Sequence, residues 1–318
     1  ITWFRRKPVL GVIRRAMRLG RDTDGYLERR MRRFLVRFSA GRLVTVRLGL
    51  RKATFGPSEL AGLFRGELPV DRNDLAGRSR PEDGSPWWID FRAELPAADP
   101  RVFEGRAQLL EQRGISVISD VDDTLKHSNV PNRRDLFHNT FVRDFVPILG
   151  MPELYRACAA KGAAFHYVSG SPWQLYEPLA EFWDSQGYPA GSFHLKRFRL
   201  RETARKMRGM SPQQAHKQAA IEPILAAFPQ RRFILVGDSG EQDPEIYAYF
   251  LQHRPEQIEH VFIRTVRGRE VDRPRLERTF GGPANGRWTP YETAGEIHDR
   301  LLQLVTDEVG ASANPRQD

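Results

Sequence analysis

The sequence predicts an α/β fold in which a doubly wound parallel sheet is preceded by a small β-rich, sandwich-like domain. Two observations predict it. From about residue 113, short runs of β-branched and aromatic residues alternate with segments of helical periodicity, which indicates a parallel sheet with helices on both faces. Before that point, β-branched and aromatic runs are separated by clusters of Gly, Pro and Asp, which is typical of a small antiparallel domain. We therefore divide the chain into a basic segment, a β-rich domain, an α/β domain and a disordered tail, at residues 1–33, 34–112, 113–309 and 310–318.

Local patterns place the individual elements. In the β-rich domain, strands are expected at 34–38, 43–48 and 87–91. A loop is expected at 77–86, where the prolines are the only apolar residues available for burial. In the α/β domain, strands are expected at 115–119, 163–168, 232–236 and 259–265. Helices are expected between them at 151–161, 173–186, 211–227 and 243–252, with kinks at Pro178 and Pro223.

Positive charge is concentrated at the start of the chain. Residues 1–60 carry 16 Lys or Arg against 4 Asp or Glu, whereas the whole chain has a net charge of +10. A concentrated positive region predicts an anionic partner, which is lipid headgroups, nucleic acid or another protein. Residues 1–33 fit either an amphipathic helix on an anionic membrane or a basic arm, because Pro8 and Gly11 would interrupt a helix. The plainer alternative is arginine-rich usage, since only seven of the 50 basic residues are Lys.

Composition excludes several classes of protein. No apolar run approaches the roughly 18 residues that a membrane-spanning helix needs. The first residues lack the apolar region of a signal peptide, and the single cysteine, Cys158, excludes an internal disulfide and fits a reducing compartment. We therefore expect a cytoplasmic protein, and peripheral attachment to a membrane surface is one of the alternatives that the basic segment leaves open.

Two carboxylates follow the first strand of the α/β domain. Asp120 and Asp122 come directly after the apolar run Ile115–Ile118, and residues two apart on an extended strand point the same way. Carboxylates at one place repel each other unless a cation joins them or one of them holds a proton. The pair therefore indicates phosphoryl chemistry at the end of this strand.

Polar motifs also follow two other strands. Ser169–Ser171 closes the second strand, Gly237–Asp243 follows a later one, and Lys217 lies in the helical segment before that later strand. Each motif alone has a plainer interpretation as a turn, a helix cap or a surface lysine. The carboxyl ends of parallel strands meet at one edge of a sheet, so the three motifs together predict one site. The histidines show no metal-ligand spacing, and zinc is not expected.

The order and placement of these motifs resemble the haloacid dehalogenase superfamily, whose phosphatases carry DxDxT, a strand-end Ser or Thr, a Lys and a paired acidic motif. More narrowly, residues 115–265 are similar to the catalytic domain of the actin-patch-protein type of phosphatidate phosphatase. The segments that carry the similarity are Ser119–Lys126, His138–Phe141, Gly150–Tyr155, Tyr167–Trp173, His216–Lys217 and Leu235–Tyr247. The resemblance implies a haloacid dehalogenase-like Rossmannoid sheet and hydrolysis of phosphatidic acid to diacylglycerol and phosphate.

The resemblance also implies roles for individual residues. Asp120 would attack phosphorus and form an aspartyl-phosphate, and Asp122 would protonate the leaving alkoxide and then take a proton from water. Ser169 and Lys217 would hold the phosphoryl oxygens as charge shifts in the transition state. The implied cofactor is Mg²⁺. Its implied ligands are Asp120, the main-chain carbonyl of Asp122 and Asp238, with Asp243 supporting the metal or fixing Lys217.

Further candidate substrate-binding residues are Thr124, Gly170, Ser171, Lys196 and Arg197. The last two begin a basic stretch with interleaved apolar residues, which fits a lipid interface, a nucleic-acid backbone or a solvated helix face. The expected partners are an anionic phospholipid and a membrane surface, with protein partners through the β-rich domain and nucleic acid as the less favoured ligand. Two alternatives stay open: a phosphatase of another bulky phosphomonoester, such as a polynucleotide end or a phosphoprotein, and a non-catalytic module that binds a membrane or a partner.

Overall fold

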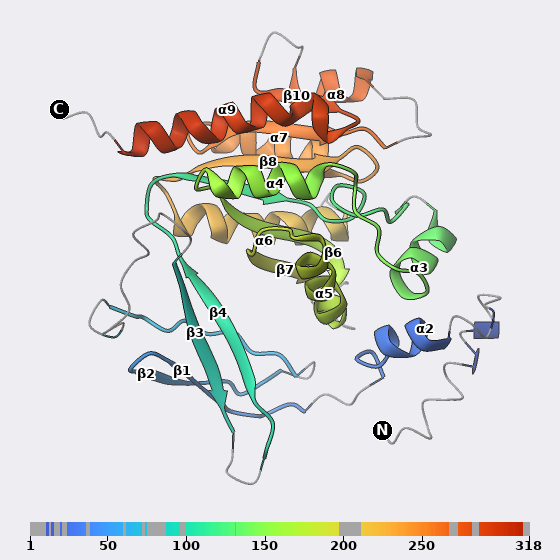
Figure 1. Ribbon diagram of the computed structural model, residues 1–318, viewed down its shortest axis with the longest axis vertical. Coiled ribbons are helices and arrows are strands. Elements are labelled where there is room, and N and C mark those ends of the chain that lie inside the picture. The colour runs from blue at the N-terminus through green and yellow to red at the C-terminus, as the bar shows by residue number, and fades with distance from the viewer. Residues whose placement is uncertain are drawn as a thin grey trace. The chain divides into compact units, whose positions relative to one another are not determined.

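The computed structural model of the chain divides into two compact units (Figure 1). Its described residues are 11–12, 14–15, 20, 24–35, 39–59, 62–71, 74, 87–95, 99–130, 132–196, 211–266, 273–281 and 286–313. Residues 36–111 form the first unit, termed the sheet unit, and residues 1–35 with 112–318 form the second, termed the α/β unit. The loop predicted at 77–86 has no described residue, and residues 1–10 of the basic segment also lie outside the described part of the chain.

The α/β unit is built on a six-stranded sheet in which every neighbouring pair of strands is parallel. In spatial order, the strands are β10 (Trp288–Tyr291), β9 (Ile258–Arg264), β8 (Arg232–Asp238), β5 (Ile115–Ser119), β6 (Ala164–Pro172) and β7 (Ser192–Lys196). The chain builds outward from β5 through β6 and β7, and then returns to the other side of β5 to form β8, β9 and β10. The strand order therefore reverses between β5 and β8, and the predicted doubly wound parallel sheet is confirmed.

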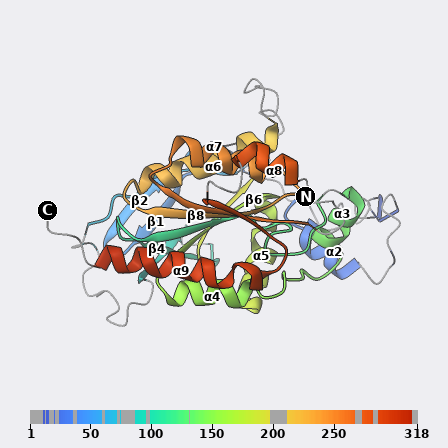
Figure 2. The ribbon, with the colours of Figure 1, turned by 90° about the horizontal axis from the view of Figure 1, so that it is seen from above.

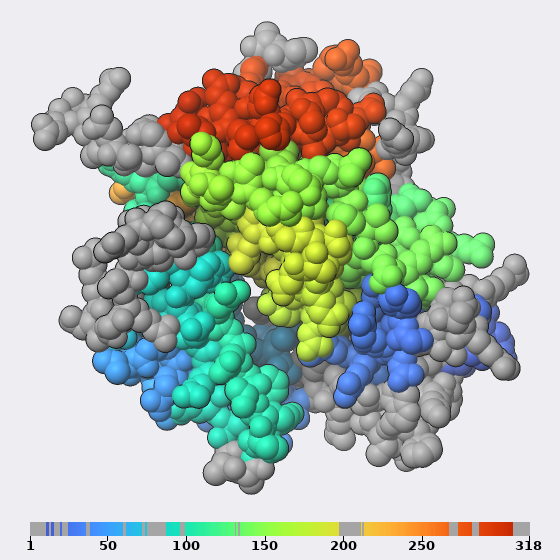
Figure 3. Space-filling model, in the orientation of Figure 1, coloured from blue at the N-terminus to red at the C-terminus, as the bar shows by residue number. Residues whose placement is uncertain are grey.

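Helices cover both faces of this sheet (Figure 2). One face carries α4 (Met151–Ala160), α5 (Tyr176–Gln186) and α9 (Ala294–Ala313), which form much of the surface seen in Figure 3. The other face carries α6 (Pro212–Ala227), α7 (Asp243–His253) and α8 (Arg273–Phe280). Two further helices, α2 (Asp24–Met31) and α3 (Arg133–Phe141), pack against each other.

Two hydrophobic cores lie between the sheet and its helices, because side chains of a strand alternate between the two faces. In β5, Ile115 and Val117 pack into the core beneath α4, α5 and α9, whereas Ile118 packs into the core beneath α6, α7 and α8. Every residue of β5 is buried, as expected for a central parallel strand. The backbone N–H of Asp120 donates to the carbonyl of Val236 at 2.8 Å, so the first residue after β5 stays joined to β8.

The four strands and four helices predicted for the α/β domain are all present. The prediction missed α3, α8, α9 and the edge strands β7 and β10. The two edge strands have only five and four residues, and polar residues or a proline interrupt their apolar pattern. The tail predicted from 310 begins too early, because α9 is anchored by the buried Val305 and its helical turns continue to Ala313. Residues 314–318 lie outside the described residues.

The sheet unit contains a four-stranded antiparallel sheet. Its spatial order is β2 (Arg51–Phe55), β1 (Val44–Leu48), β3 (Trp87–Glu94) and β4 (Phe103–Leu109). This confirms a β-rich part of the chain with strands at 43–48 and 87–91. The strand predicted at 34–38 is wrong at Phe34 and Leu35, which form a turn after α2, and residues 36–38 are not described. Phe34 packs edge-on against Phe141 of α3, with ring centroids 5.6 Å apart, and this contact replaces strand pairing.

In the described part of the chain, no helix combines the length and the apolar character needed to cross a membrane.

Candidate functional site

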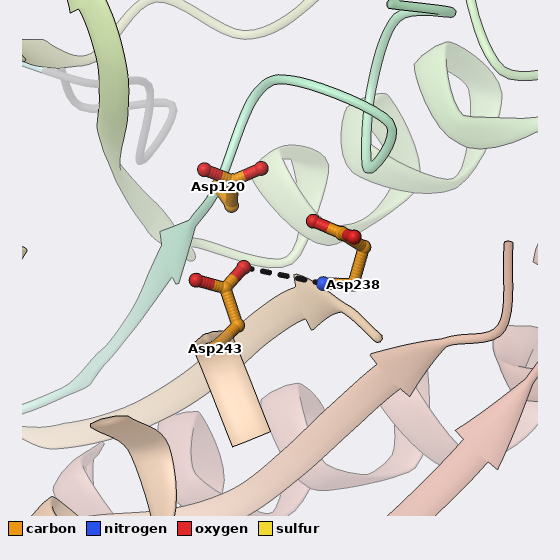
Figure 4. A group of neighbouring side chains, drawn as sticks. All are labelled: Asp120, Asp238 and Asp243. Atoms are coloured by element: carbon orange, nitrogen blue, oxygen red, sulfur yellow. Dashed lines mark hydrogen bonds between the residues drawn. The ribbon is translucent and has the colours of Figure 1, made fainter. Parts of the chain in front are cut away.

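Three aspartates meet where the strand order reverses (Figure 4). Asp120 follows β5, Asp238 ends β8 and Asp243 begins α7. One carboxylate oxygen from each lies within 4.8 Å of the other two, and all three residues are fully buried. Figure 4 shows the carboxylates around a common space, with the backbone N–H of Asp238 donating to Asp243 Oδ2 at 3.2 Å. The fold therefore brings together three of the four residues that the sequence predicts as metal ligands.

A buried ammonium faces these aspartates. Lys217 of α6 places Nζ 2.6 Å from Asp120 Oδ1 and 3.1 Å from Glu241 Oε2, and Nζ also contacts Asp243. Burial lowers the pKa of Lys217, but the three carboxylates raise it by more, so the net shift is upward. Lys217 is therefore a permanent positive charge at the centre of the acidic group.

The acidic group carries more negative charge than Lys217 balances. Burial and neighbouring carboxylates raise the pKa of Asp120 against the opposing effect of Lys217, and burial and Asp243 raise the pKa of Asp238. Asp238 Oδ2 is buried and has no hydrogen-bond partner among the described residues. A divalent cation would supply the missing positive charge, and carboxylate oxygens are the ligands that hard cations such as Mg²⁺ prefer. The residues present therefore fit a divalent metal ion.

The Asp122 carboxylate has a different set of partners. Its Oδ1 lies 2.5 Å from Lys126 Nζ and accepts a hydrogen bond from Ser128 Oγ at 2.7 Å. Its Oδ2 accepts from Ser169 Oγ at 2.8 Å and from Ser171 Oγ at 3.0 Å. Burial raises the pKa of Asp122, but the Lys126 charge and these hydrogen bonds outweigh burial and lower it. Asp122 is therefore ionised, and donors hold both of its oxygens.

The loop after β5 is fixed by its own side chains. Thr124 Oγ1 donates to Asp120 Oδ2 at 3.2 Å and so orients that carboxylate. The Asp123 carboxylate accepts three backbone N–H groups at 2.8 Å each, from residues 128, 129 and 130. Asp123 has a φ of 56°, a left-handed conformation that is uncommon outside glycine, and Arg264 Nη1 donates to its carbonyl at 2.7 Å. These contacts tie the loop to β9 through Arg264 and to residues 128–130, which follow the loop.

The strand-end serines of β6 lie beside Asp122. Ser169 Oγ donates to Asp122 and accepts from the backbone N–H of Ser171 at 2.9 Å, and the half-buried Gly170 lies between the two serines in sequence. His216 Nε2 lies 3.1 Å from the Ser169 carbonyl oxygen. Lys196 ends β7, where it is aligned with Pro172 at the end of β6. Arg197 lies outside the described residues.

Three polar residues at the site were missed by the sequence prediction. Lys126 and Ser128 hold Asp122, and Glu241 adds a third carboxylate to Lys217. Lys126 and Glu241 lie inside the motifs that drew attention to the site, so their positions in the sequence were the available signal. That signal was weak, because a lysine four residues after an aspartate contacts it only if the loop turns back on itself, and the backbone bridge between Asp122 and Lys126 shows that it does.

A family model and a yeast relative that match the segment containing this site carry the same name, phosphatidate phosphatase APP1. Residues 115–265 match the family model described as phosphatidate phosphatase APP1, catalytic domain. The phosphatidate phosphatase APP1 of Saccharomyces cerevisiae is 35% identical over 216 residues, which are 67% of this chain and 35% of that protein. An uncharacterized protein of Schizosaccharomyces pombe is 31% identical over 170 residues, which are 52% of this chain and 27% of that protein. The chain thus covers about a quarter to a third of the length of these relatives.

A chain in a structure of the Pnkp1/Rnl/Hen1 complex is 11% identical to this one, with a TM-score of 0.33 over 62% of this chain and 61% of that chain. Similarity at this level carries no information about function. The aspartates, Lys217 and the β6 serines all lie inside the segment that the family model matches. In sequence, residues 115–265 of this chain are thus similar to the family of phosphatidate phosphatase APP1 catalytic domains.

Proposed function

We propose that this protein hydrolyses phosphatidic acid to diacylglycerol and inorganic phosphate, with Mg²⁺ as its cofactor. The observation that carries the proposal is the buried group of Asp120, Asp238 and Asp243 around Lys217, inside the segment that matches the family model. The name of the yeast relative, which aligns with two thirds of this chain, supports phosphatidate over other phosphomonoesters.

Asp120 is the nucleophile of the proposed reaction. One of its carboxylate oxygens forms a bond to phosphorus as the bond between phosphorus and the glycerol oxygen breaks, which leaves an aspartyl-phosphate. Water then attacks phosphorus, releases phosphate and restores the carboxylate. Thr124 and Lys217, at 3.2 Å and 2.6 Å from the two Asp120 oxygens, hold this carboxylate in one orientation for both steps. Mg²⁺, when held by the aspartates, would draw negative charge from the phosphoryl group and reduce its repulsion of Asp120.

Asp122 transfers the protons in this proposal. It donates one proton to the leaving glycerol oxygen in the first step and accepts one from water in the second. Its partners Lys126, Ser128, Ser169 and Ser171 favour the ionised form, which is the form that the second step requires. The first step requires that a proton reach Asp122 once substrate is bound, and the negative charge of the bound phosphate would favour that protonation.

We also propose that the protein works at a membrane surface, because its proposed substrate is a membrane lipid and the start of its chain is strongly basic. Some of that basic charge already has an acidic partner within the protein. In the α/β unit, Arg33 forms an ion pair with Glu177 of α5, and Arg29 lies 3.8 Å from Glu181. Attachment to anionic lipid would therefore depend on the other basic residues. Binding of protein partners by the sheet unit stays a prediction from the sequence.

Replacement of the nucleophile tests the proposal. We expect Asp120→Asn to lower the rate of phosphate release from phosphatidate by about 10³-fold or more, because an amide cannot form the covalent intermediate. The assay measures phosphate released from phosphatidate in detergent micelles, with Mg²⁺ and with a chelator. Asp299→Asn is the matched control, because it makes the same chemical change on an exposed side chain of α9.

Three results would contradict the proposal. Equal Mg²⁺-dependent release by the wild type and Asp120→Asn would rule out this nucleophile. Faster release from nucleotides, polynucleotide ends or phosphopeptides than from phosphatidate would rule out a lipid substrate, and no release from any of them would favour a binding module.

A further inference from the structure

The ring of Phe145 lies next to cations from two segments that are far apart in the sequence. The Arg30 guanidinium carbon lies over this ring at 3.9 Å from its centroid, and Lys126 Nζ lies over it at 5.0 Å. Both distances are within the range in which a cation is attracted to the face of an aromatic ring. Phe145 is itself buried and packs edge-on against Phe182 of α5, with centroids 5.7 Å apart. The ring is therefore a fixed contact between Arg30 and Lys126.

Arg30 belongs to α2, and several contacts hold this helix on the α/β unit. Arg30 is 3% exposed, and its Nη1 donates to the carbonyl of Thr140 in α3 at 2.7 Å. Tyr26 donates its hydroxyl to Asp144 Oδ2 at 2.8 Å. Beyond α2, Arg33 pairs with Glu177 of α5. Figure 3 shows α2 lying against α3 and α5 at the surface. Residues 24–35 are thus an integral part of the α/β unit, although the sheet unit separates them from it in the sequence.

Lys126 connects this contact to the proposed active site. Its ammonium is 1% exposed and lies 2.5 Å from both Asp122 Oδ1 and Ser128 Oγ. Ser128 also donates to Asp122 Oδ1, so the ammonium and this hydroxyl together hold one oxygen of the carboxylate. Phe145 lies against Lys126, and Arg30 packs on Phe145, so the helix restricts where the lysine can move.

We propose that Arg30 is a positioning residue for Asp122, acting through Phe145 and Lys126, and that α2 is a required part of the catalytic apparatus. The inference rests on the proposed function of Asp122 and extends the apparatus beyond residues 115–265, the segment that matches the family model. Loss of the Arg30 guanidinium would release Phe145 and let the Lys126–Asp122 pair shift. A small shift of a group that transfers protons lowers the rate of chemistry more than it lowers substrate binding.

Substitutions at Arg30 test the inference. We expect Arg30→Met, which keeps an apolar side chain on the ring, to lower kcat for phosphatidate about tenfold and to change KM less than about twofold. Arg30→Lys keeps a cation over the ring and is expected to recover most of the kcat. Arg32→Met is the matched control, because Arg32 is an exposed arginine in the turn directly after the same helix and its loss is expected to leave kcat unchanged.

A double-mutant cycle tests the path through the ring. Phe145→Leu removes the aromatic face and keeps an apolar side chain. If Arg30 acts through Phe145, Arg30→Met lowers kcat much less in the Phe145→Leu background than in the wild type. Equal effects of Arg30→Met in both backgrounds would overturn the path. Thermal unfolding of each variant separates a loss of kcat from a loss of folded protein.

A spectroscopic measurement decides the inference even if phosphatidate is not the substrate. The ¹³Cγ NMR resonance of Asp122, assigned by its disappearance in Asp122→Asn, should shift in Arg30→Met and stay in place in Arg32→Met. An unchanged Asp122 resonance in folded Arg30→Met, or a wild-type kcat in that variant, would overturn the positioning role. A wild type without phosphatase activity would instead refute the proposed function, and the Asp122 resonance would still report on Arg30.

Discussion

Asp120 and Asp122 are two residues apart and differ in their electrostatic surroundings. Burial raises the pKa of both carboxyl groups. Around Asp120, other carboxylates add to this effect, and the pKa shift is upward despite Lys217. Around Asp122, Lys126 and the serine hydroxyls outweigh burial, and the shift is downward. Neighbouring acids with opposite shifts are suited to different tasks, which supports separate roles as nucleophile and as proton carrier.

His166 gives the protein a specific pH dependence of stability. Burial first, then the charges of His194 and Arg231, lower the pKa of His166 to about 3. In the unfolded chain a histidine binds a proton near pH 6.5. Between these values the unfolded state holds the additional proton, so stability decreases as the pH falls. We expect His166 alone to lower the free energy of unfolding by up to about 1.4 kcal/mol for each pH unit in this window.

Urea unfolding at pH 7, 6 and 5 measures this effect. His166→Gln should show a shallower loss of stability with falling pH than the wild type, whatever its stability at pH 7. His298→Gln is the control, because His298 is exposed on α9 and should keep the wild-type slope. A His166→Gln slope equal to that of the wild type would show that other groups cause the pH dependence.

At the scale of elements, the turn between β8 and α7 positions two of the three aspartates, and it requires close approach of the backbone. A Cβ atom on Gly237 would lie 2.5 Å from Asp243 Oδ2 and 2.7 Å from the Tyr247 ring. Tyr247 cannot move away easily, because it is fully buried and its hydroxyl donates to the Val236 carbonyl at 3.1 Å. A side chain at residue 237 would therefore displace Asp243 from the acidic group.

We expect Gly237→Ala to weaken Mg²⁺ binding about 10- to 100-fold, the size of effect seen when a group that supports a metal site is displaced. Isothermal titration calorimetry with Mg²⁺ measures the change. Gly295→Ala in α9 is the control, because a Cβ atom there meets no atom within 4 Å. Wild-type Mg²⁺ affinity in Gly237→Ala would argue against a metal site that includes Asp243.

The elements that the sequence predicted well are those with strong local patterns. β5 and β8 are apolar runs whose side chains are buried on both faces of the sheet. Helix α7 begins with the Asp243-Pro244 pair, which is typical of a helix start. The elements that were missed, such as β7 and β10, lie at the edges of the sheet. There a strand is stabilised mainly by backbone hydrogen bonds to its inner neighbour. Backbone hydrogen bonds do not require particular side chains, so a short edge strand has no clear sequence pattern.

At the scale of the whole molecule, net charge bears on the proposed attachment to a membrane surface. The chain carries a net charge of +10, with its basic surplus in residues 1–60. We expect it to co-sediment with vesicles that contain phosphatidylserine, which is anionic and is not the proposed substrate. Binding should weaken from about 0.1 M to about 1 M salt, because the Debye length falls from about 10 Å to about 3 Å.

Phosphatidylcholine vesicles provide the neutral comparison for this experiment. Equal binding to phosphatidylcholine and phosphatidylserine, or binding that salt leaves unchanged, would remove the electrostatic basis for membrane attachment. A double-stranded DNA fragment at the same salt concentrations tests the competing prediction of nucleic-acid binding.

The sequence by itself determined the parallel sheet and the edge of that sheet where the site forms. Helical and strand periodicity are local properties, and in a parallel sheet every residue that follows a strand lies at the same edge. Asp120, Ser169 and Asp238 could therefore be assigned to one region before any coordinates were known.

Only the tertiary structure decided which charges pair and which segments complete the site. Lys217 pairs with Asp120 and Lys126 with Asp122, although both lysines come from the same matched segment. Arg30 reaches Thr140 across 110 positions, which assigns a helix near the start of the chain to the α/β unit. Contacts of this kind depend on how distant segments pack, because packing decides which partner lies within reach of each buried charge. No local pattern of residues encodes that information.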